Sequence, residues 1–356
     1  MNIRQASTGY EAWLRTHLRI IPRDLTLKHA RMAEAPFPFL RATFYRWAQI
    51  FSECCPALIN AERVQGVGDL HVENFGTWRD AEGRLVWGVN DFDEAHRLPF
   101  TNDLVRLATS ATLAVAGGHL ALEGKRAAEL ILEGYEDSLD QDGRPLVLAE
   151  HHPALRLMAT YRLHDAEHFW EKLNAFPTVR SRAHSGVAKL LSRSLPDPDL
   201  AFRLVHRVAG LGSLGRERFV AITEFQGGMV AREAKALAPS ACVWAEGRRS
   251  RKIRYQRVLD LAVRCRDPFV TVEGRWLVRR LAPDCSRIDL AALPKERDEE
   301  RLLHAMGWET ANVHLGSRSA RRLRADLQRR PHHWLTNAAS IMSEVVNKEW
   351  KAWQRE

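Results

Sequence analysis

Hydrophobic residues in the first half of the chain recur mostly at the spacing of amphipathic helices. One segment differs: in 85-LVWGVND-91, Leu85, Trp87 and Val89 occupy alternate positions, as in a half-buried strand. We therefore expect the first half to be mainly helical with one short strand region. The expected helices cover residues 10–20, 40–52, 102–139 with a break at Gly117–Gly118, and 155–175.

The pattern changes near Pro196 and Pro198, beyond which apolar residues alternate with polar ones. Strands are expected over residues 201–209, 217–225, 229–237 and 269–281, the last turning at Glu273–Gly274. A helix over 249–265 completes this small β-rich unit, and helices return after Pro294. The expected parts of the chain are residues 1–196, 197–290 and 291–356.

The composition is that of an ordinary globular protein. The chain has 356 residues, of which 45% are hydrophobic and 27% charged, so it has room for two hydrophobic cores. No apolar run approaches the roughly 20 residues that span a bilayer, and the N-terminal segment lacks the apolar middle of a signal peptide. The five cysteines match no zinc or disulfide spacing, so we interpret them as reduced thiols. These observations predict a cytoplasmic protein without a membrane partner.

The chain is basic, with 53 Lys and Arg against 44 Asp and Glu, a net charge of +9. Arginines crowd into 316-GSRSARRLRADLQRR-330, and such a run can attract phosphates, nucleic acid or acidic lipid. Aromatic residues are not interleaved with it, as a single-strand binding groove would prefer. We therefore interpret the run as a solvated helix face and expect no nucleic-acid partner.

Two short segments, 68-GDLHVENFG-76 and 90-NDFDEA-95, concentrate small polar side chains where a core would contain valines. If Asp69 and Asn74 lie on one loop and Asp91 follows the preceding strand, their oxygens can converge on one point. That arrangement suits Mg²⁺, which proteins hold through one or two carboxylates together with waters and phosphates. Metal-bridged phosphates need charge neutralisation, positioning and a carboxylate that accepts a proton, which is the division of labour in phosphoryl transfer.

These segments resemble parts of aminoglycoside phosphotransferases and choline kinases. GDLHVENFG resembles their catalytic loop, in which an aspartate is followed five positions later by an asparagine, and NDFDEA resembles their metal-binding segment. The stretch 99-PFTNDL-104 resembles the one that leads into their next helix. By position, the resemblance implies a catalytic base at Asp69, metal ligands at Asn74 and Asp91, and structural support of the catalytic loop by Asp103. Asp93 is either a further metal ligand or a surface residue.

A kinase also needs a loop that covers the ATP phosphates and a lysine that pairs with them. The candidate loop is 210-GLGSLG-215, which has the pattern G-x-G-x-x-G at Gly210, Gly212 and Gly215 and also contains Ser213. This pattern marks dinucleotide-binding folds as well, but there the loop must open a helix. Here it lies between two strand-like segments, and Lys235 falls on the next strand, at a distance that suits the kinase lysine.

The glycine loop and the lysine follow the catalytic loop in this chain, whereas they precede it in ordinary kinases. We interpret this order as a circular permutation, which proteins tolerate at surface positions. The expected fold is α+β: a bilobal, protein-kinase-like fold, circularly permuted, with a mainly helical lobe and a small β-sheet nucleotide lobe. An uncharacterised bacterial family, known only as a domain of unknown function and grouped with the kinase-like superfamily, is similar in its order of motifs, over roughly residues 30–315.

The principal hypothesis is an ATP- and Mg²⁺-dependent phosphotransferase that acts on a small hydroxyl- or amino-bearing acceptor. The alternatives are a nucleotidyltransferase and a nucleotide-binding pseudokinase. Gly68 stands where regulated protein kinases have arginine, and Asp91 is followed by Phe-Asp-Glu, so neither a protein substrate nor an activation-loop switch is indicated. The glutamate that usually pairs with the lysine has only two weak candidates, Glu233 and Glu246.

A competing motif is 164-HDAEH-168, which matches H-x-x-E-H at His164, Glu167 and His168. On a helix, two histidines four positions apart could bind zinc, so a zinc metallohydrolase is a remote alternative. No third ligand can be assigned from the sequence, and we interpret the match as chance.

Overall fold

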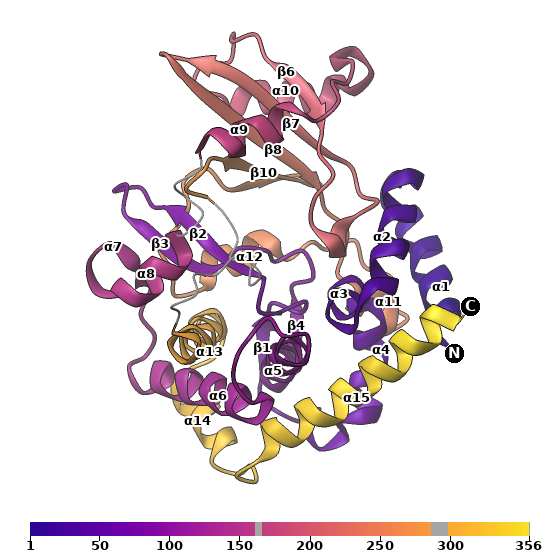
Figure 1. Ribbon diagram of the computed structural model, residues 1–356, viewed down its shortest axis with the longest axis vertical. Coiled ribbons are helices and arrows are strands. Elements are labelled where there is room, and N and C mark those ends of the chain that lie inside the picture. The colour runs from indigo at the N-terminus through magenta and orange to yellow at the C-terminus, as the bar shows by residue number, and fades with distance from the viewer. Residues whose placement is uncertain (161–165, 286–297, 356) are drawn as a thin grey trace.

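The computed structural model describes residues 1–160, 166–285 and 298–355, which form a mixed α+β structure (Figure 1). The helices are α1 Ile3–Arg15, α2 Pro22–Glu34, α3 Pro36–Ala42, α4 Phe44–Cys54, α5 Phe100–Ala116, α6 Gly124–Asp140, α7 Leu148–His151, α8 Pro153–Thr160, α9 Ala166–Asn174, α10 Ser185–Ser194, α11 Ala241–Ala245, α12 Tyr255–Leu261, α13 Glu299–Leu315, α14 Ala320–Leu327 and α15 Trp334–Arg355. Short 3₁₀ turns lie at η1 Pro56–Leu58, η2 Ser181–His184 and η3 Leu211–Ser213. The strands are β1 Arg63–Gly66, β2 Phe75–Arg79, β3 Leu85–Val89, β4 His96–Pro99, β5 Leu146–Val147, β6 Arg203–His206, β7 Arg218–Phe225, β8 Gly228–Ala236, β9 Thr271–Glu273 and β10 Trp276–Leu281.

A five-stranded antiparallel sheet lies above the helices in Figure 1, in the order β6-β7-β8-β10-β9. The strands expected between residues 201 and 281 are all part of it. Three residues apart along β8, Ala234 packs on one face of the sheet with Leu191 of α10, and Ala231 packs with Leu173 of α9 on the other.

Helices α9 and α10 both precede the boundary that the sequence predicted at residue 196, yet they cover this sheet. Part of the chain before residue 196 therefore packs against the sheet. An amphipathic pattern identifies a helix with a buried side, but it does not tell which part of the molecule that side packs against.

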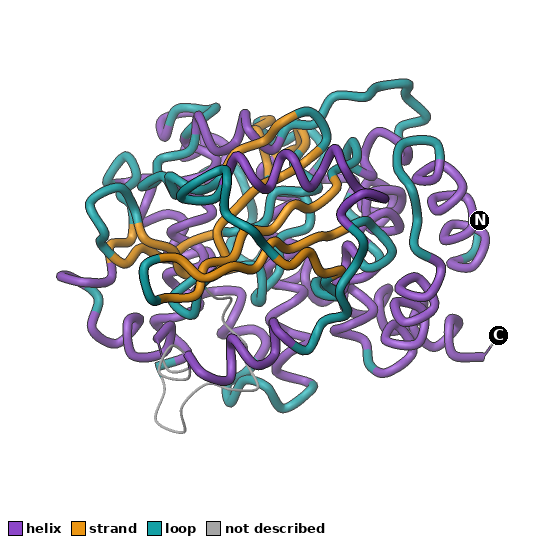
Figure 2. The backbone as a smooth tube through the Cα atoms, turned by 90° about the horizontal axis from the view of Figure 1, so that it is seen from above, coloured by secondary structure: helices purple, strands orange, loops and turns teal. Residues whose placement is uncertain are grey.

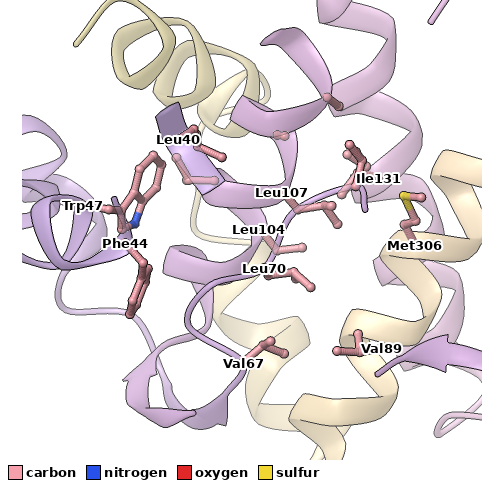
Figure 3. Close-up of a cluster of buried hydrophobic side chains, with 14 of the residues drawn as sticks. Leu40, Phe44, Trp47, Val67, Leu70, Val89, Leu104, Leu107, Ile131 and Met306 are labelled. Atoms are coloured by element: carbon pink, nitrogen blue, oxygen red, sulfur yellow. The ribbon is translucent and has the colours of Figure 1, made fainter. Parts of the chain in front are cut away.

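The helices below the sheet pack around α5, the most buried of them, and α15 runs along their outer side to the C-terminus (Figures 1 and 2). Helices α6 and α13 approach each other most closely at Gly134 and Gly307, where a Cβ would overlap a backbone carbonyl of the facing helix. Leu104, Leu107, Ile131 and Met306 fill the space between these helices (Figure 3). The chain that completes this core after residue 298 lies far from the first helices in sequence.

Two small sheets carry the loops that matter for function: β1 pairs with β4, and β2, β3 and β5 form a second sheet. Some expected elements differ in extent. The helix predicted over 249–265 is confined to α12, and five basic residues within 248–254 explain this, because like charges on neighbouring helical turns repel. In the described part of the chain, no helix combines the length and the apolar character that crossing a membrane requires.

Candidate functional site

The loop between β1 and β2 is anchored by the buried side chains of Val67 and Leu70, which point into the core (Figure 3). Gly68 has a φ of +82°, and a Cβ at this position would overlap the carbonyl oxygen of Glu94. Glycine is therefore required here for two reasons, the backbone conformation and the close approach of a second loop.

Asp103, on the first turn of α5, supports this loop from inside the protein. Its carboxylate accepts hydrogen bonds from the backbone N–H groups of Val67 (2.6 Å) and Gly68 (3.0 Å). His314 of α13 lies against the same carboxylate, with Nε2 3.1 Å from Oδ2, and both side chains are fully buried. Asp103 therefore ties the loop to α5 and α13.

Asp69 projects from the loop into a small polar pocket. Arg106, three residues after Asp103 on α5, donates from Nε to Asp69 Oδ1 (3.0 Å) and from Nη2 to the same oxygen and to Leu40 O (2.8 Å). The other oxygen, Oδ2, faces the glycine loop, where a Cβ on Gly212 would lie 3.3 Å from it. Arg106 was missed by the sequence analysis, although its spacing from Asp103 places both residues on neighbouring turns of one helix.

The amide of Asn74 is oriented by two backbone carbonyls. Nδ2 donates to Asp69 O (3.0 Å) and to Asp91 O (3.1 Å), which ties the two polar segments together. Because both partners of Nδ2 are acceptors, the amide cannot be turned over without losing both bonds. Oδ1 is buried and has no hydrogen-bond partner among the residues that the structure describes, and Asn74 lines the pocket described below.

Lys235 of β8 meets Asp91 and Asp93 across the boundary between the sheet and the helices. Its Nζ lies 3.0 Å from Asp91 Oδ2 and 2.6 Å from Asp93 Oδ2, and the lysine is 1% exposed. Burial lowers the pKa of Lys235, and the two carboxylates oppose this effect. Burial and the neighbouring Asp91 raise the pKa of Asp93, and Lys235 and Arg216 oppose this shift. The side chain of Asp93 is only 10% exposed and pairs with Lys235, so of the two interpretations the surface residue is wrong.

The glycine loop closes over Asp69. Lys28 of α2 donates from Nζ to Gly212 O (3.2 Å), and Ile21 N donates to Gly215 O (2.8 Å). Gly210 has a φ of +75°, and Ser213 within η3 accepts a hydrogen bond from Arg218 Nη2 (2.7 Å). The pocket enclosed by this loop and the polar segments has a volume of about 40 Å³. It also contains Asp69, Asn74, Asp91 and Asp93 in its lining.

A much larger cleft of about 1320 Å³ lies on the other side of the glycine loop. The sheet contributes Arg207, Arg218 and Arg279 to its walls, and the helical side contributes Trp78, Tyr255 and Arg264. Of the predicted site residues, the pocket is lined by Asp69, Asn74, Asp91, Asp93, Gly210, Gly212 and Ser213. Lys235, Asp103 and Gly215 line neither space, and Gly210 lines both, so the glycine loop lies between the pocket and the cleft.

Arg216, directly after the glycine loop, anchors it to the second polar segment. Its Nη2 lies 2.9 Å from Glu94 Oε1 and 3.2 Å from Tyr10 Oη, and its Nη1 lies 3.4 Å from Asp93 Oδ2. Glu94 also accepts from Ala241 N (2.6 Å). Burial raises the pKa of Glu94, and Arg216 opposes that shift. The sequence analysis assigned no role to Arg216 or Glu94, because an ion pair 122 residues apart leaves no local pattern.

Neither candidate for the lysine's glutamate partner contacts Lys235 in the described part of the chain. Glu233 pairs with three arginines of the sheet, and Glu246 pairs with Arg248 (3.2 Å) and lies 3.5 Å from His96. Lys235 instead pairs with the aspartates of the second polar segment. Both proposed candidates were therefore wrong as partners of this lysine.

The zinc alternative gains no support. His164 lies outside the described residues, and His168 contributes to the lining of the large cleft. Within residues 1–160, 166–285 and 298–355, no three His, Cys, Asp or Glu side chains gather as a metal site. None of the five cysteines forms a disulfide.

The arginine-rich run near the C-terminus is largely paired. Arg318, Arg324 and Arg330 bind Glu62, Asp140 and Asp326, respectively. Carboxylates of the same chain therefore neutralise part of the positive charge of this run.

Fold and site together define a mixed α+β protein with a carboxylate-rich pocket between a small sheet and a helical core. Residues 19–191, just under half of the chain, match a family described as "uncharacterized protein conserved in bacteria (DUF2252)". No curated protein and no solved structure matches the chain. The matched range contains both polar segments and Asp103, but it ends before the glycine loop and Lys235.

Proposed function

We propose that the protein is an ATP- and Mg²⁺-dependent phosphotransferase with a small hydroxyl- or amino-bearing acceptor. The observation that carries this proposal is the meeting of Lys235 with Asp91 and Asp93, at 3.0 and 2.6 Å. Lys235 and Asp91 are 144 residues apart. A lysine on a strand after a glycine loop and an aspartate after a catalytic-loop motif are the two halves of a kinase centre.

A circularly permuted, bilobal kinase-like fold accounts for the order of these parts. The five-stranded sheet would be the nucleotide lobe, and the helices before and after it would together form the other lobe. The burial of α13 and α15 against α5 and α6 supports this assignment, because the C-terminal segment completes the same core as the first helices.

The residues present fit a magnesium ion. Asn74 offers a buried oxygen, Oδ1, that is fixed in orientation and has no hydrogen-bond partner among the described residues. Asp91 and Asp93 supply carboxylates, and one or two carboxylates completed by waters and phosphates are what this ion usually takes. Asn74, Asp91 and Asp93 would hold the ion, which when bound would neutralise phosphate charge.

Asp69 would orient the acceptor and take its proton. Arg106 holds one carboxylate oxygen in place, so the second is the oxygen left to face the pocket. The acceptor oxygen or nitrogen would form a bond to the γ-phosphorus while the bond between that phosphorus and the bridging oxygen of ADP breaks. Asp69 would receive the proton released by the acceptor, and the side chain of Lys235 would face the phosphates.

The glycine loop must move for this reaction. A pocket of about 40 Å³ cannot contain a triphosphate tail, since ligand sites usually have volumes of roughly 300–1,000 Å³. Lys28 and Ile21 each give the loop one hydrogen bond from the helical side, and Arg216 anchors its C-terminal end. Lifting the loop would join the pocket to the large cleft.

The same closure of the loop favours a second candidate, a protein that binds nucleotide in the large cleft and transfers nothing. In that case Asp69 would stay covered by Gly212 and would never meet an acceptor.

Transfer of label from ATP to a metabolite pool separates these functions. With Mg²⁺ and ATP labelled at the γ-phosphate, the unmodified protein should label a pool component, and Asp69→Asn should lower the rate by about 100-fold or more. Asp140→Asn, a substitution of an exposed aspartate on α6, is the matched control and should change nothing. Transfer of α-label would instead identify a nucleotidyltransferase, and nucleotide binding without any transfer would identify the non-catalytic alternative.

A further inference from the structure

Three arginines converge on one fully buried carboxylate in the sheet. Arg279 Nε lies 2.8 Å from Glu233 Oε1, Arg218 Nη1 lies 3.3 Å from Oε2, and Arg207 Nη1 pairs with the same Oε2. Glu233 is 0% exposed. The three guanidinium groups therefore share one negative partner.

The charge of this cluster is not balanced by its own members. Three guanidiniums and one carboxylate leave a net charge of +2, and a further group that accepts from Arg218, Ser213 Oγ, is neutral. Despite burial, Arg218, Arg279 and Arg207 hold the pKa of Glu233 well below its usual range. Buried charges are costly unless they are paired, so an excess of this kind favours an anion from outside the cluster.

The cluster lies on the wall of the large cleft, where a ligand could reach it. Arg207, Arg218 and Arg279 all contribute to the cleft lining, and Arg207 and Arg279 keep 23% and 15% of their side chains exposed. In the sheet register, Arg218 is opposite Lys235 and Arg279 is opposite Glu233. The arginines thus stand beside the lysine that faces the metal-binding aspartates.

The glycine loop connects this wall with Asp69. Arg207 precedes the loop and Arg218 follows it, and a Cβ on Gly210 would lie 3.1 Å from Arg218 Nη2. A chain of phosphates bound along the glycine loop would extend from Lys235 to the three guanidinium groups. Arginine suits this task because its planar fork binds phosphate oxygens in pairs.

We propose that Arg207, Arg218 and Arg279 bind the polyphosphate chain of the nucleotide, and that Glu233 is a positioning residue that assembles the three before the ligand arrives. This inference rests on the proposed function and names the residues that bind its nucleotide. A purely structural role for the cluster, in which it only ties strands β7, β8 and β10 together, is the competing account.

Calorimetric titration with inorganic tripolyphosphate tests the cluster without assuming any reaction. Arg207→Gln and Arg279→Gln are the test variants, because both side chains are at the cleft surface and neither is needed to fill the core. Arg193→Gln is the matched control: it removes an arginine of the same sheet unit whose ion pair with Glu273 is exposed, at 58% and 63%. Thermal unfolding of each variant verifies that it is folded. If one of the two test variants does not fold, the other alone is enough to test the proposal.

Tripolyphosphate should bind the unmodified protein and Arg193→Gln equally, and binding should weaken about tenfold to hundredfold in Arg207→Gln or Arg279→Gln. ATP should lose a similar factor, whereas adenosine should be unaffected. Failure of tripolyphosphate to bind, or equal binding by all four proteins, would overturn the inference and leave a structural role. If the tripolyphosphate test fails but label is transferred from ATP, the proposed function stands without this role for the arginines. If no label is transferred but tripolyphosphate binds as expected, the binding role of the arginines stands without the proposed function.

Discussion

Replacing Asp103 by Asn should destabilise the protein, because the buried carboxylate satisfies two backbone donors at once. Val67 N and Gly68 N both donate to it, and the side chain of His314 lies against it. Asparagine has the same shape but only one acceptor oxygen. In either orientation of its amide, one backbone N–H would face an NH₂ group in a site that water does not reach.

The expected cost follows from these bonds. A hydrogen bond to a charged group is worth about 1.5–3 kcal/mol, and a buried donor left without a partner costs about 1–3 kcal/mol. The free energy of unfolding should therefore fall by about 2–5 kcal/mol in Asp103→Asn. Because the loop carries Asp69, the rate of any ATP-dependent transfer should fall as well.

Asp137→Asn is the matched control, since Asp137 of α6 also pairs with a histidine, His304, at 2.8 Å. This pair is open to solvent, with side chains 57% and 33% exposed, so its loss should cost about 0–1 kcal/mol. Urea unfolding at neutral pH measures both variants, with the slope of the transition verifying that the two unfold alike. If Asp103→Asn loses no more stability than Asp137→Asn, the loop does not depend on Asp103 and the reasoning is wrong.

Two further predictions concern stability. Gly68→Ala should lower the free energy of unfolding by more than about 3 kcal/mol, because φ is +82° and the new methyl group would overlap a backbone oxygen. Gly83→Ala, with φ +75° and open space around it, should lower it by only about 1–2 kcal/mol in the same urea assay. Equal losses would contradict the proposed close approach of the two loops. Burial raises the pKa of Glu309 from 4.5 to about 7, so the protonated carboxyl group is favoured in the folded protein. The free energy of unfolding should therefore fall as pH rises through 7. Between pH 4.5 and pH 8 the loss should be about 1.36 × 2.5, or roughly 3 kcal/mol. Glu309→Gln should flatten this dependence of the urea midpoint on pH, while Glu344→Gln, on an exposed position of α15, should not; an unchanged profile in Glu309→Gln would refute the assignment.

The polar site could be predicted from sequence to a considerable extent, because its residues lie in two short segments with fixed spacing. Asp69, Asn74 and Asp91 share one pocket in the structure. Alternating apolar residues also located the strands that flank the glycine loop and the strand that carries Lys235. In each case the signal was local: a spacing of a few residues or a period of two.

What the sequence could not show are contacts between distant charged residues. Arg106, Arg216 and Glu94 determine how the pocket is closed, yet each is one of many charged residues without a distinctive neighbourhood in sequence. Glu233 was considered only as a weak candidate partner for Lys235. Its actual partners come from three different strands or loops, and only the register of the sheet brings them together.

The most direct test of a phosphoryl-transfer centre is calorimetric titration of ATP into the protein with Mg²⁺ and with a chelator, repeated for Asp91→Asn and for the control Asp140→Asn. If Asn74, Asp91 and Asp93 hold a metal that bridges the phosphates, ATP should bind the unmodified and control proteins with Mg²⁺, and affinity should fall at least about tenfold with chelator or in Asp91→Asn. Absence of ATP binding, or binding that is identical under all of these conditions, would contradict the assignment.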